Sequence, residues 1–321
     1  MKSNPELQTR LAQIDERLVE LRRSSDANVA HREEFEGLQE EADRLAGELY
    51  ADLEPWDHVG LARHDRRPYS LDYIELLFTD FVELHGDRRY GDDGAIVAGL
   101  AHFNGAPVAI IGQQKGRTAT ERKQRNFGMA RPEGYRKAMR VMQLAAKMHR
   151  PIITFVDTPG ADCLDDSESR GISEAIATNQ RDMFFLPVPI ITAILGEGGS
   201  GGAIGLGVAN RVLMLEHAYY SVIAPESCAA ILWRSAEKRK EAAAALKLTS
   251  ADALELGIID EVVPEPPGGA HRDPVAAATA LRTSLEQNLA HLKQFPAELL
   301  MEARYAKFRL MGGPEEARRG K

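Results

Sequence analysis

Several kinds of residue are scarce in this chain, and each scarcity removes a class of protein. Only two cysteines occur, Cys163 and Cys228, and they form no Cys-x-x-Cys pair. A disulfide framework is therefore excluded, and we expect no metal site in this chain. No apolar run reaches the length of about 20 residues that crosses a membrane.

Basic residues are fewer than acidic residues in this chain. The 321 residues include 40 Lys and Arg against 48 Asp and Glu, which gives a formal net charge of −8. This balance argues against general binding to nucleic acid or to a membrane surface. The first residues lack the apolar segment of a secretory signal, so we expect a cytoplasmic protein. Hydrophobic residues make up 44% of the chain, which is enough for a large core.

Residues 1–54 differ from the rest in pattern and predict a helical hairpin. Two apolar stripes repeat at spacings of three and four residues, and the polar segment 24–28 separates them. Such stripes are typical of a core or a subunit interface rather than of an active site. The first stripe is Leu7, Leu11, Ile14, Leu18 and Leu21, and the second is Phe35, Leu38, Ala42, Leu45 and Leu49.

Residues 55–321 predict an α/β domain with a largely parallel sheet. We interpret 55–68 as a linker and 70–84 as a helix, followed by a hairpin that turns at Asn104-Gly105. From residue 132 onward, helical and apolar segments alternate, as they do in parallel α/β sheets. The expected helices are 132–149, 169–183 and 274–292, and the expected strands are 152–156, 188–195, 211–215 and 220–223.

The most informative segment is Gly196-Glu-Gly-Gly-Ser-Gly-Gly-Ala203, between the strand expected at 188–195 and a helix expected at 203–209. Glycines leave backbone N–H groups accessible to a ligand, and a helix N-terminus adds partial positive charge. Such a turn can stabilise an oxyanion, bind a phosphate, or only let a helix pack closely on a sheet. The Lys and the Ser or Thr of a phosphate-binding loop are missing, and a dinucleotide-binding pattern does not fit. An oxyanion hole is the interpretation that we favour.

A second turn, Asp157-Thr-Pro-Gly160, follows the preceding expected strand. Because adjacent parallel strands end at the same edge of a sheet, we expect the two turns to lie together. Asp157 is either catalytic or a cap of its own turn. Ser200 superficially resembles a nucleophile in a Gly-x-Ser-x-Gly elbow, but neither His217 nor His271 completes a convincing triad.

A basic segment begins at residues 113–117 and includes Lys115 and Arg117. This many Lys and Arg residues in one segment is unusual in an acidic chain. The segment is interpreted either as a site for coenzyme phosphates or an acidic carrier protein, or as a solvated surface.

Taken together, these segments closely resemble the alpha subunits of bacterial acetyl-CoA carboxylase carboxyltransferase. The resemblance covers nearly the whole chain, and residues 253–264 are similar to the segment that closes the crotonase superfamily core. The resemblance implies a crotonase-like (ClpP/crotonase) ββα superhelix with an N-terminal helical hairpin. The matching segments are Arg67-Pro-Tyr-Ser-Leu-Asp-Tyr73, Gly112-Gln-Gln-Lys-Gly-Arg117, Asn126-Phe-Gly-Met129, Pro132-Glu-Gly-Tyr-Arg-Lys-Ala138, Ile223-Ala-Pro-Glu226 and both glycine turns.

The resemblance also implies a reaction and its partners. Members of the family transfer a carboxyl group from carboxybiotin, held on the biotin carboxyl carrier protein, to acetyl-CoA, and malonyl-CoA results. A beta subunit with a zinc ribbon supplies most of the acetyl-CoA side in an α2β2 assembly, and biotin carboxylase recharges the biotin. We expect this chain to supply the biotin side.

These implications assign roles to particular residues. We expect the N–H groups of Gly201 and Gly202 to stabilise the oxyanion of the biotin ureido group. Gly198 and Gly199 would shape the turn, and Gly160 and Ala161 would form a wall of the carboxybiotin pocket. Lys115 and Arg117 would bind phosphate or the carrier protein.

One segment departs from the family pattern. After Asp157-Thr-Pro-Gly160 the family usually continues Ala-Tyr-Pro-Gly, whereas this chain has Ala161-Asp-Cys-Leu164. Two other functions stay open at this point, and this altered segment motivates the second of them. One is a self-contained crotonase-like acyl-CoA hydratase or decarboxylase, and the other is a scaffold that binds a carrier protein without catalysis.

Overall fold

One mixed sheet forms the centre of the computed structural model, which describes residues 5–23 and 29–313. Its strands are β1 (Thr79–Glu83), β2 (Ile96–Phe103), β3 (Ala106–Gln113), β4 (Ile152–Thr158), β5 (Ile190–Gly199), β6 (Arg211–Leu215), β7 (Tyr219–Ser221) and β8 (Glu261–Val263). The strand order is β1-β2-β3-β4-β5-β6-β8, and β7 also pairs with β5. The pairs from β3 to β8 are parallel, as expected, and only β1-β2-β3 is antiparallel.

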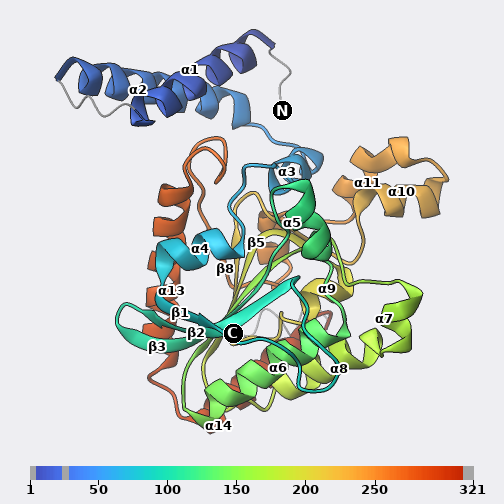
Figure 1. Cartoon of the computed structure of the whole chain (residues 1–321). Coiled ribbons are helices and arrows are strands. Elements are labelled where there is room, and N and C mark those ends of the chain that lie inside the picture. Colours follow the sequence, from blue (N-terminus) through green and yellow to red (C-terminus); the bar gives the residue numbers. More distant parts are fainter. Residues whose placement is uncertain (1–4, 24–28, 314–321) are drawn as a thin grey trace.

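The helices surround this sheet (Figure 1). The first six are α1 (Pro5–Arg23), α2 (Val29–Tyr50), α3 (Pro55–Ala62), α4 (Ser70–Leu77), α5 (Ala119–Gln124) and α6 (Pro132–Lys147). The next four are α7 (Asp165–Ser169), α8 (Ile172–Met183), α9 (Ser200–Ile204) and α10 (Pro225–Trp233). The last are α11 (Arg239–Ala245), α12 (Ser250–Glu255), α13 (Pro274–Leu292) and α14 (Ala297–Leu310). Within the described ranges, none of the helices has the length and apolar character needed to span a membrane.

The strands β4 and β5 form the middle of the sheet, and every residue in them is buried. Their near-continuous apolar sequence is typical of parallel strands covered on both faces. The second half of β5 has its own neighbour, because β6 pairs with Ile191–Ile194 whereas β7 pairs with Glu197–Gly199. The glycine-rich end of β5 is therefore held in the sheet on both sides, by β4 and by β7.

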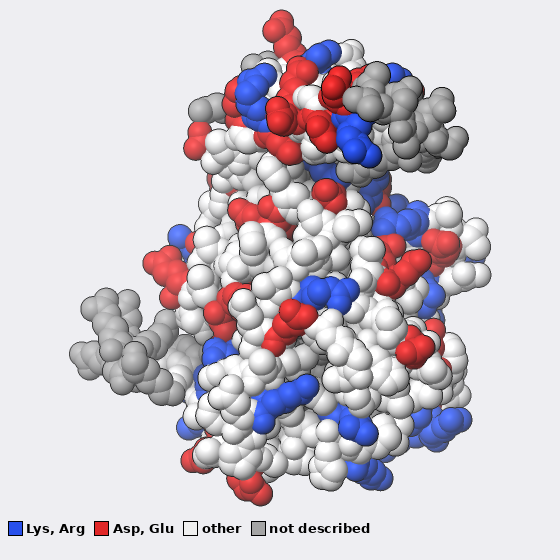
Figure 2. All heavy atoms as spheres, turned by 90° about the vertical axis from the view of Figure 1, so that its left-hand side faces the viewer, with Lys and Arg blue, Asp and Glu red and all other residues white. Residues whose placement is uncertain are grey.

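The expected helical hairpin is confirmed as α1 and α2, which lie at one end of the α/β body (Figure 1). The two apolar stripes pack on each other in a core of their own. The connecting segment 24–28 lies outside the described residues. Figure 2 shows charged side chains crowded on this hairpin, above a broad area of the body with few charges. Arg272 of the body pairs with Asp15 of α1 at 2.8 Å.

The helix predicted at 70–84 is wrong in its second half. The α4 helix ends at Leu77, the backbone of Phe78 is extended, and β1 follows. The apolar spacing of Phe81 and Leu84 fits a helix, but pairing of β1 with β2 decides the structure. Gly99 of β2 makes room for Phe81, because a Cβ on Gly99 would lie 2.7 Å from the Phe81 ring.

Other boundaries also differ from the prediction. The segment 55–68 contains the helix α3, which begins at Pro55, a residue favoured in the first turn of a helix. The strand β5 continues to Gly199, so only the second half of the glycine segment leaves the sheet. The following helix is α9 at Ser200–Ile204 rather than a helix at 203–209. The helix α14 was not predicted.

Candidate active site

The two glycine-containing turns lie side by side at the edge of the sheet where β4 and β5 end. Thr158 and Gly198 are paired across the two strands. A Cβ on Gly199 would lie 2.2 Å from the carbonyl oxygen of Pro159, so only glycine allows this approach. The expectation that the two turns meet at one edge is confirmed.

The contact continues into α9. A Cβ on Gly202 would lie 2.5 Å from the carbonyl carbon of Gly160 and 2.6 Å from the nitrogen of Ala161. Gly160 and Gly201, by contrast, border open space: a Cβ on Gly160 would meet nothing within 4 Å, and one on Gly201 would meet only Ile176 at 3.7 Å. The two turns thus touch at Gly199 and Gly202 and leave room beside Gly160 and Gly201.

Gly201 and Gly202 are the second and third residues of α9, which has five residues. The first N–H groups of any helix have no partner inside that helix. Ser200 precedes them with a φ of 48°, in the left-handed region, and its side chain is exposed. The two histidines considered for a triad with Ser200 contact other histidines instead: His217 is hydrogen bonded to His58, and His271 is stacked on His64.

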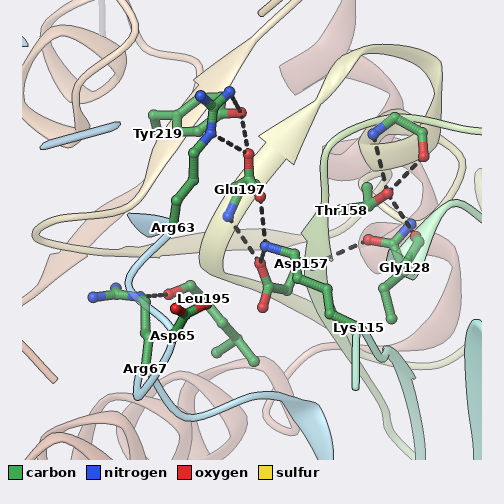
Figure 3. Close-up of polar contacts among 12 residues, drawn as sticks. Arg63, Asp65, Arg67, Lys115, Gly128, Asp157, Thr158, Leu195, Glu197 and Tyr219 are labelled. Carbon is green, nitrogen blue, oxygen red and sulfur yellow. Dashed lines mark hydrogen bonds and ion pairs between the residues drawn. The ribbon is translucent and has the colours of Figure 1, made fainter. Parts of the chain in front are cut away.

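Behind the turns lies a network of buried charges (Figure 3). The Lys115 ammonium, which follows β3, lies 2.7 Å from both Asp157 and Glu197. The backbone N–H of Glu197 also donates to Asp157 Oδ1 at 2.9 Å. Asp157 is therefore not a cap of its own turn. It joins the ends of β4 and β5 to a buried cation.

Glu197 is the centre of the network. The Arg63 guanidinium, just after α3, and the Tyr219 hydroxyl each donate to Glu197 Oε2 at 2.7 Å. Arg63 also pairs with Glu226 of α10 at 2.5 Å. These contacts join the end of β5 to α3, β7 and α10. Sequence reasoning missed them, although a glutamate inside an otherwise apolar strand was a visible signal.

Asp157 and Glu197 have opposite pKa shifts. Burial raises the pKa of Asp157, and Lys115 offsets that only in part. Burial also acts to raise the pKa of Glu197, but the combined attraction of Lys115 and Arg63 and the Tyr219 hydrogen bond lower it to about 2. Glu197 is therefore the firmly ionised member, and Asp157 Oδ2 is a buried oxygen without a hydrogen-bond partner.

Lys115 and Arg117 occupy different surroundings. The Lys115 side chain is 11% exposed and already paired with two carboxylates. The Arg117 side chain is 41% exposed, pairs with Asp72 and lies over the Tyr69 ring. Of the two, Arg117 is the one that a partner could reach. A small cavity of about 210 Å³ lies beside Lys115 and is lined by Tyr69, Phe127, Pro159 and other residues.

The segment 161–164, which departs from the family pattern, is well anchored. Asp162 is buried and accepts a hydrogen bond from Ser167 Oγ at 2.9 Å. It also pairs with Arg131 at 3.3 Å, and its N–H donates to the carbonyl of Ala130 at 3.0 Å. These contacts hold Ala161 against α9, where the second turn faces the first.

No group of three or more metal-ligating side chains occurs among the described residues.

A second, fully buried ion pair also contacts β5. Arg67 and Glu265 lie 2.6 Å apart. Arg67 also donates to the carbonyl of Leu195 in β5 at 2.8 Å.

Comparison with known proteins shows clear relatives. The family model described as "Acetyl co-enzyme A carboxylase carboxyltransferase-like" matches residues 5–312. An "Acetyl-coenzyme A carboxylase carboxyl transferase subunit alpha" from Geobacter sulfurreducens is 56% identical over 269 residues, which are 84% of each chain. The protein with the same name from Bordetella avium is 51% identical over 98% of each chain.

Solved structures with a similar fold are more distant. A Pseudomonas malonate decarboxylase hetero-tetramer in complex with coenzyme A contains a chain with a TM-score of 0.60 and 20% identity, covering 79% of this chain and 95% of that one. The transcarboxylase 12S core has a TM-score of 0.54 and 20% identity, covering 69% of this chain and 43% of that one. At this identity the likeness shows the crotonase-like carboxyltransferase fold alone.

Proposed function

This chain belongs to the family of acetyl-CoA carboxylase carboxyltransferase alpha subunits, and we propose from this premise that its two facing glycine turns form the carboxybiotin side of the active site. The enzyme transfers a carboxyl group from carboxybiotin to acetyl-CoA and so forms malonyl-CoA for fatty acid synthesis. The observation that carries the assignment of the site is the contact of Gly202 with Gly160 and Ala161.

The open space beside Gly160 and Gly201 fits a flat ligand that approaches the backbone closely. Carboxybiotin would supply the carboxyl group and a ureido oxygen that becomes anionic when that group is given up. The N–H groups of Gly201 and Gly202 donate hydrogen bonds to this oxygen. Gly198 and Gly199 give the turn its shape, while Gly160 and Ala161 form the opposite wall. Hydrogen bonds from rigid backbone donors are effective because they need no reorganisation during the reaction.

The charged network holds the two turns in place rather than taking part in proton transfer. Lys115 pairs with both Asp157 and Glu197, and Glu197 in turn orients Arg63 and Tyr219. Arg117 is exposed and is our candidate contact for a phosphate or for the carrier protein.

The remaining parts of the enzyme belong to other chains. The relatives are named subunit alpha, which supports a beta subunit as the partner of this chain. We propose an α2β2 assembly in the cytoplasm, in which the beta subunit carries a zinc ribbon and supplies most of the acetyl-CoA side. Biotin carboxylase and the biotin carboxyl carrier protein complete the system.

The test uses this chain co-expressed with a zinc-ribbon beta subunit from the same genome. The assay is malonyl-CoA decarboxylation with free biotin, which is the reverse reaction. We expect turnover that requires both chains. Turnover by this chain alone would favour a self-contained acyl-CoA enzyme, and a stable complex without turnover would favour a scaffold.

The role of the backbone donor is tested by comparing Gly202→Pro with Gly202→Ala in that complex. Both variants place a Cβ against Gly160, but only proline removes the N–H. We expect proline to lower kcat by a further factor of about 100 to 1,000, the usual effect of one oxyanion donor. Equal turnover by the two folded variants would contradict the assignment of Gly202. The control is Gly60→Ala, where a Cβ meets nothing within 4 Å.

A further inference from the structure

A single buried side chain spans the two turns. Gln113 is the last residue of β3, and its exposed fraction is 0%. Its amide oxygen accepts the backbone N–H of Asp157 at 3.1 Å, and its amide nitrogen donates to the carbonyl oxygen of Gly202 at 2.8 Å. One planar amide group thus joins the end of β4 to the first turn of α9.

The carbonyl of Gly202 receives its hydrogen bonds from side chains rather than from the helix. In α9 and just after it, the N–H of Gly205 donates to Gly201 and the N–H of Leu206 donates to Ala203. The Gly202 carbonyl accepts instead from Gln113 and, at 3.2 Å, from the Tyr135 hydroxyl. A helix of five residues is too short to be stable by itself, so outside contacts decide its orientation.

The orientation of α9 decides where its N–H groups point. Peptide units are planar, and each residue has only two soft dihedral angles, so fixing the Gly202 carbonyl limits the rotation of the adjacent peptide units. On its other side, Gly202 already touches Gly160 and Ala161. The Gln113 amide therefore sets the separation of α9 from the end of β4.

We propose that Gln113 is a positioning residue, whose amide clamps the two turns together and so aims the N–H groups of Gly201 and Gly202 at the ligand. The inference rests on the function proposed above for these N–H groups. Gln113 itself does not touch the ligand.

The test replaces the amide with a group whose donor can be switched by pH. In Gln113→Glu, the protonated side chain copies the amide, because its carbonyl accepts from Asp157 N–H and its O–H donates to Gly202. The ionised form has no donor and repels the Gly202 carbonyl. Burial raises the pKa of a carboxyl group, which places this transition within an accessible pH range. The ionisable neighbours of this side chain include Tyr135, which shares the Gly202 carbonyl, and the ion pair of Asp157 with Lys115.

We expect Gln113→Glu to lower kcat for malonyl-CoA decarboxylation about 100-fold at pH 8, the scale of a misplaced catalytic group. The KM for malonyl-CoA should change little, because that substrate binds elsewhere. Relative to wild type, the loss should shrink steadily as the pH falls to 6. The matched control is Gln114→Glu, the neighbouring buried glutamine, whose amide oxygen accepts from Leu71 N–H and not from the turns. It should show no such pH dependence.

Hydrogen exchange of the peptide 199–206 gives a readout that does not depend on activity. In Gln113→Glu, this peptide should exchange faster than in wild type at pH 8. At pH 6 its exchange rate should approach the wild-type rate, after correction for intrinsic rates. If wild type shows no turnover with its beta subunit, the proposed function fails, and the exchange result still tests the clamp. The proposal would be overturned if the peptide 199–206 of Gln113→Glu exchanged at the wild-type rate and its kcat was either unchanged or lowered by the same factor at every pH.

A second variant covers the case in which Gln113→Glu does not fold. Tyr135→Phe removes the other donor to the Gly202 carbonyl. It should raise exchange of the same peptide and lower kcat by a smaller factor, of about 10, in line with the loss of one neutral hydrogen bond. Unchanged exchange and unchanged kcat would contradict a role for the contacts of this carbonyl.

Discussion

Asp157 and Glu197 bind the same ammonium group. Asp157 Oδ1 and Glu197 Oε1 each lie 2.7 Å from Lys115 Nζ. The two carboxylates come from the ends of β4 and β5, the strands that lead into the two glycine turns. Two buried carboxylates repel each other unless a cation lies between them, so Lys115 keeps these strand ends together.

Lys115→Met should therefore destabilise the protein strongly. Removing one partner of a buried pair typically costs about 3–5 kcal/mol in the free energy of unfolding, because the other charge is left unpaired. The loss should be larger at pH 8 than at pH 5. At pH 5 one of the two carboxyl groups takes up a proton more readily, which relieves part of the repulsion between them. Urea unfolding at both pH values measures it. The control is Lys238→Met, whose pair with Glu241 is exposed. A loss no larger than the control would contradict the prediction.

His271 should limit stability in mild acid. Burial, followed by the nearness of His64, lowers the pKa of His271 from 6.5 to about 3. Between these values the unfolded chain binds a proton that the folded chain excludes, so stability falls as the pH falls below 6.5. Wild type should have a lower free energy of unfolding at pH 5 than at pH 7. His271→Phe, which keeps a ring on His64, should reduce this difference by about 2 kcal/mol. Urea unfolding measures that difference, and the exposed His291→Phe, as the control, should retain the wild-type value.

Asp162 should anchor the segment that departs from the family pattern. Asp162→Ala removes the acceptor of the Ser167 hydroxyl and the partner of Arg131. We expect a loss of about 1–3 kcal/mol in local stability, the usual effect of unpairing buried polar groups. Hydrogen exchange of residues 160–170 and turnover of the complex with the beta subunit measure it. Cys163→Ala, at an exposed position, is the control. Wild-type exchange in Asp162→Ala would show that the segment has another anchor.

The ion pair of Asp15 and Arg272 should tie the hairpin to the body. The two side chains are 20% and 7% exposed and lie 2.8 Å apart. Asp15→Asn should speed proteolytic cleavage within 51–54, while helix content stays constant because the hairpin has its own core. Arg10→Gln, which breaks a pair inside the hairpin, is the control. Equal cleavage of both variants would argue that other contacts hold the hairpin. The division of the chain at residue 54 stays a prediction until then.

Much of the architecture followed from local patterns. The stripes of Leu11 and Leu45 predicted the hairpin, because a helix places every third or fourth residue on one face. The alternation of helices and apolar runs after residue 132 predicted parallel strands. Parallel strands end at a common edge, so the meeting of the turns after β4 and β5 could be inferred without coordinates.

The errors fall where two patterns compete. Phe81 and Leu84 continue the helical spacing of Tyr73 and Leu77, yet β1 pairs with β2. Similarly, the glycines at 196–199 favour a turn, but β4 and β7 hold them in the sheet from both sides. In both cases, pairing with a strand distant in sequence outweighs local preference.

The sequence by itself determined the helical hairpin, the α/β alternation, the family and the two glycine turns, because periodicity and turn chemistry act between residues close in the chain. Only the tertiary structure decided which side chains support those turns. Lys115 and Glu197 are 82 positions apart, and Gln113 and Gly202 are 89 apart. Such partners are selected by strand order and by the cost of burying unpaired polar groups, and both exist only once the sheet has formed.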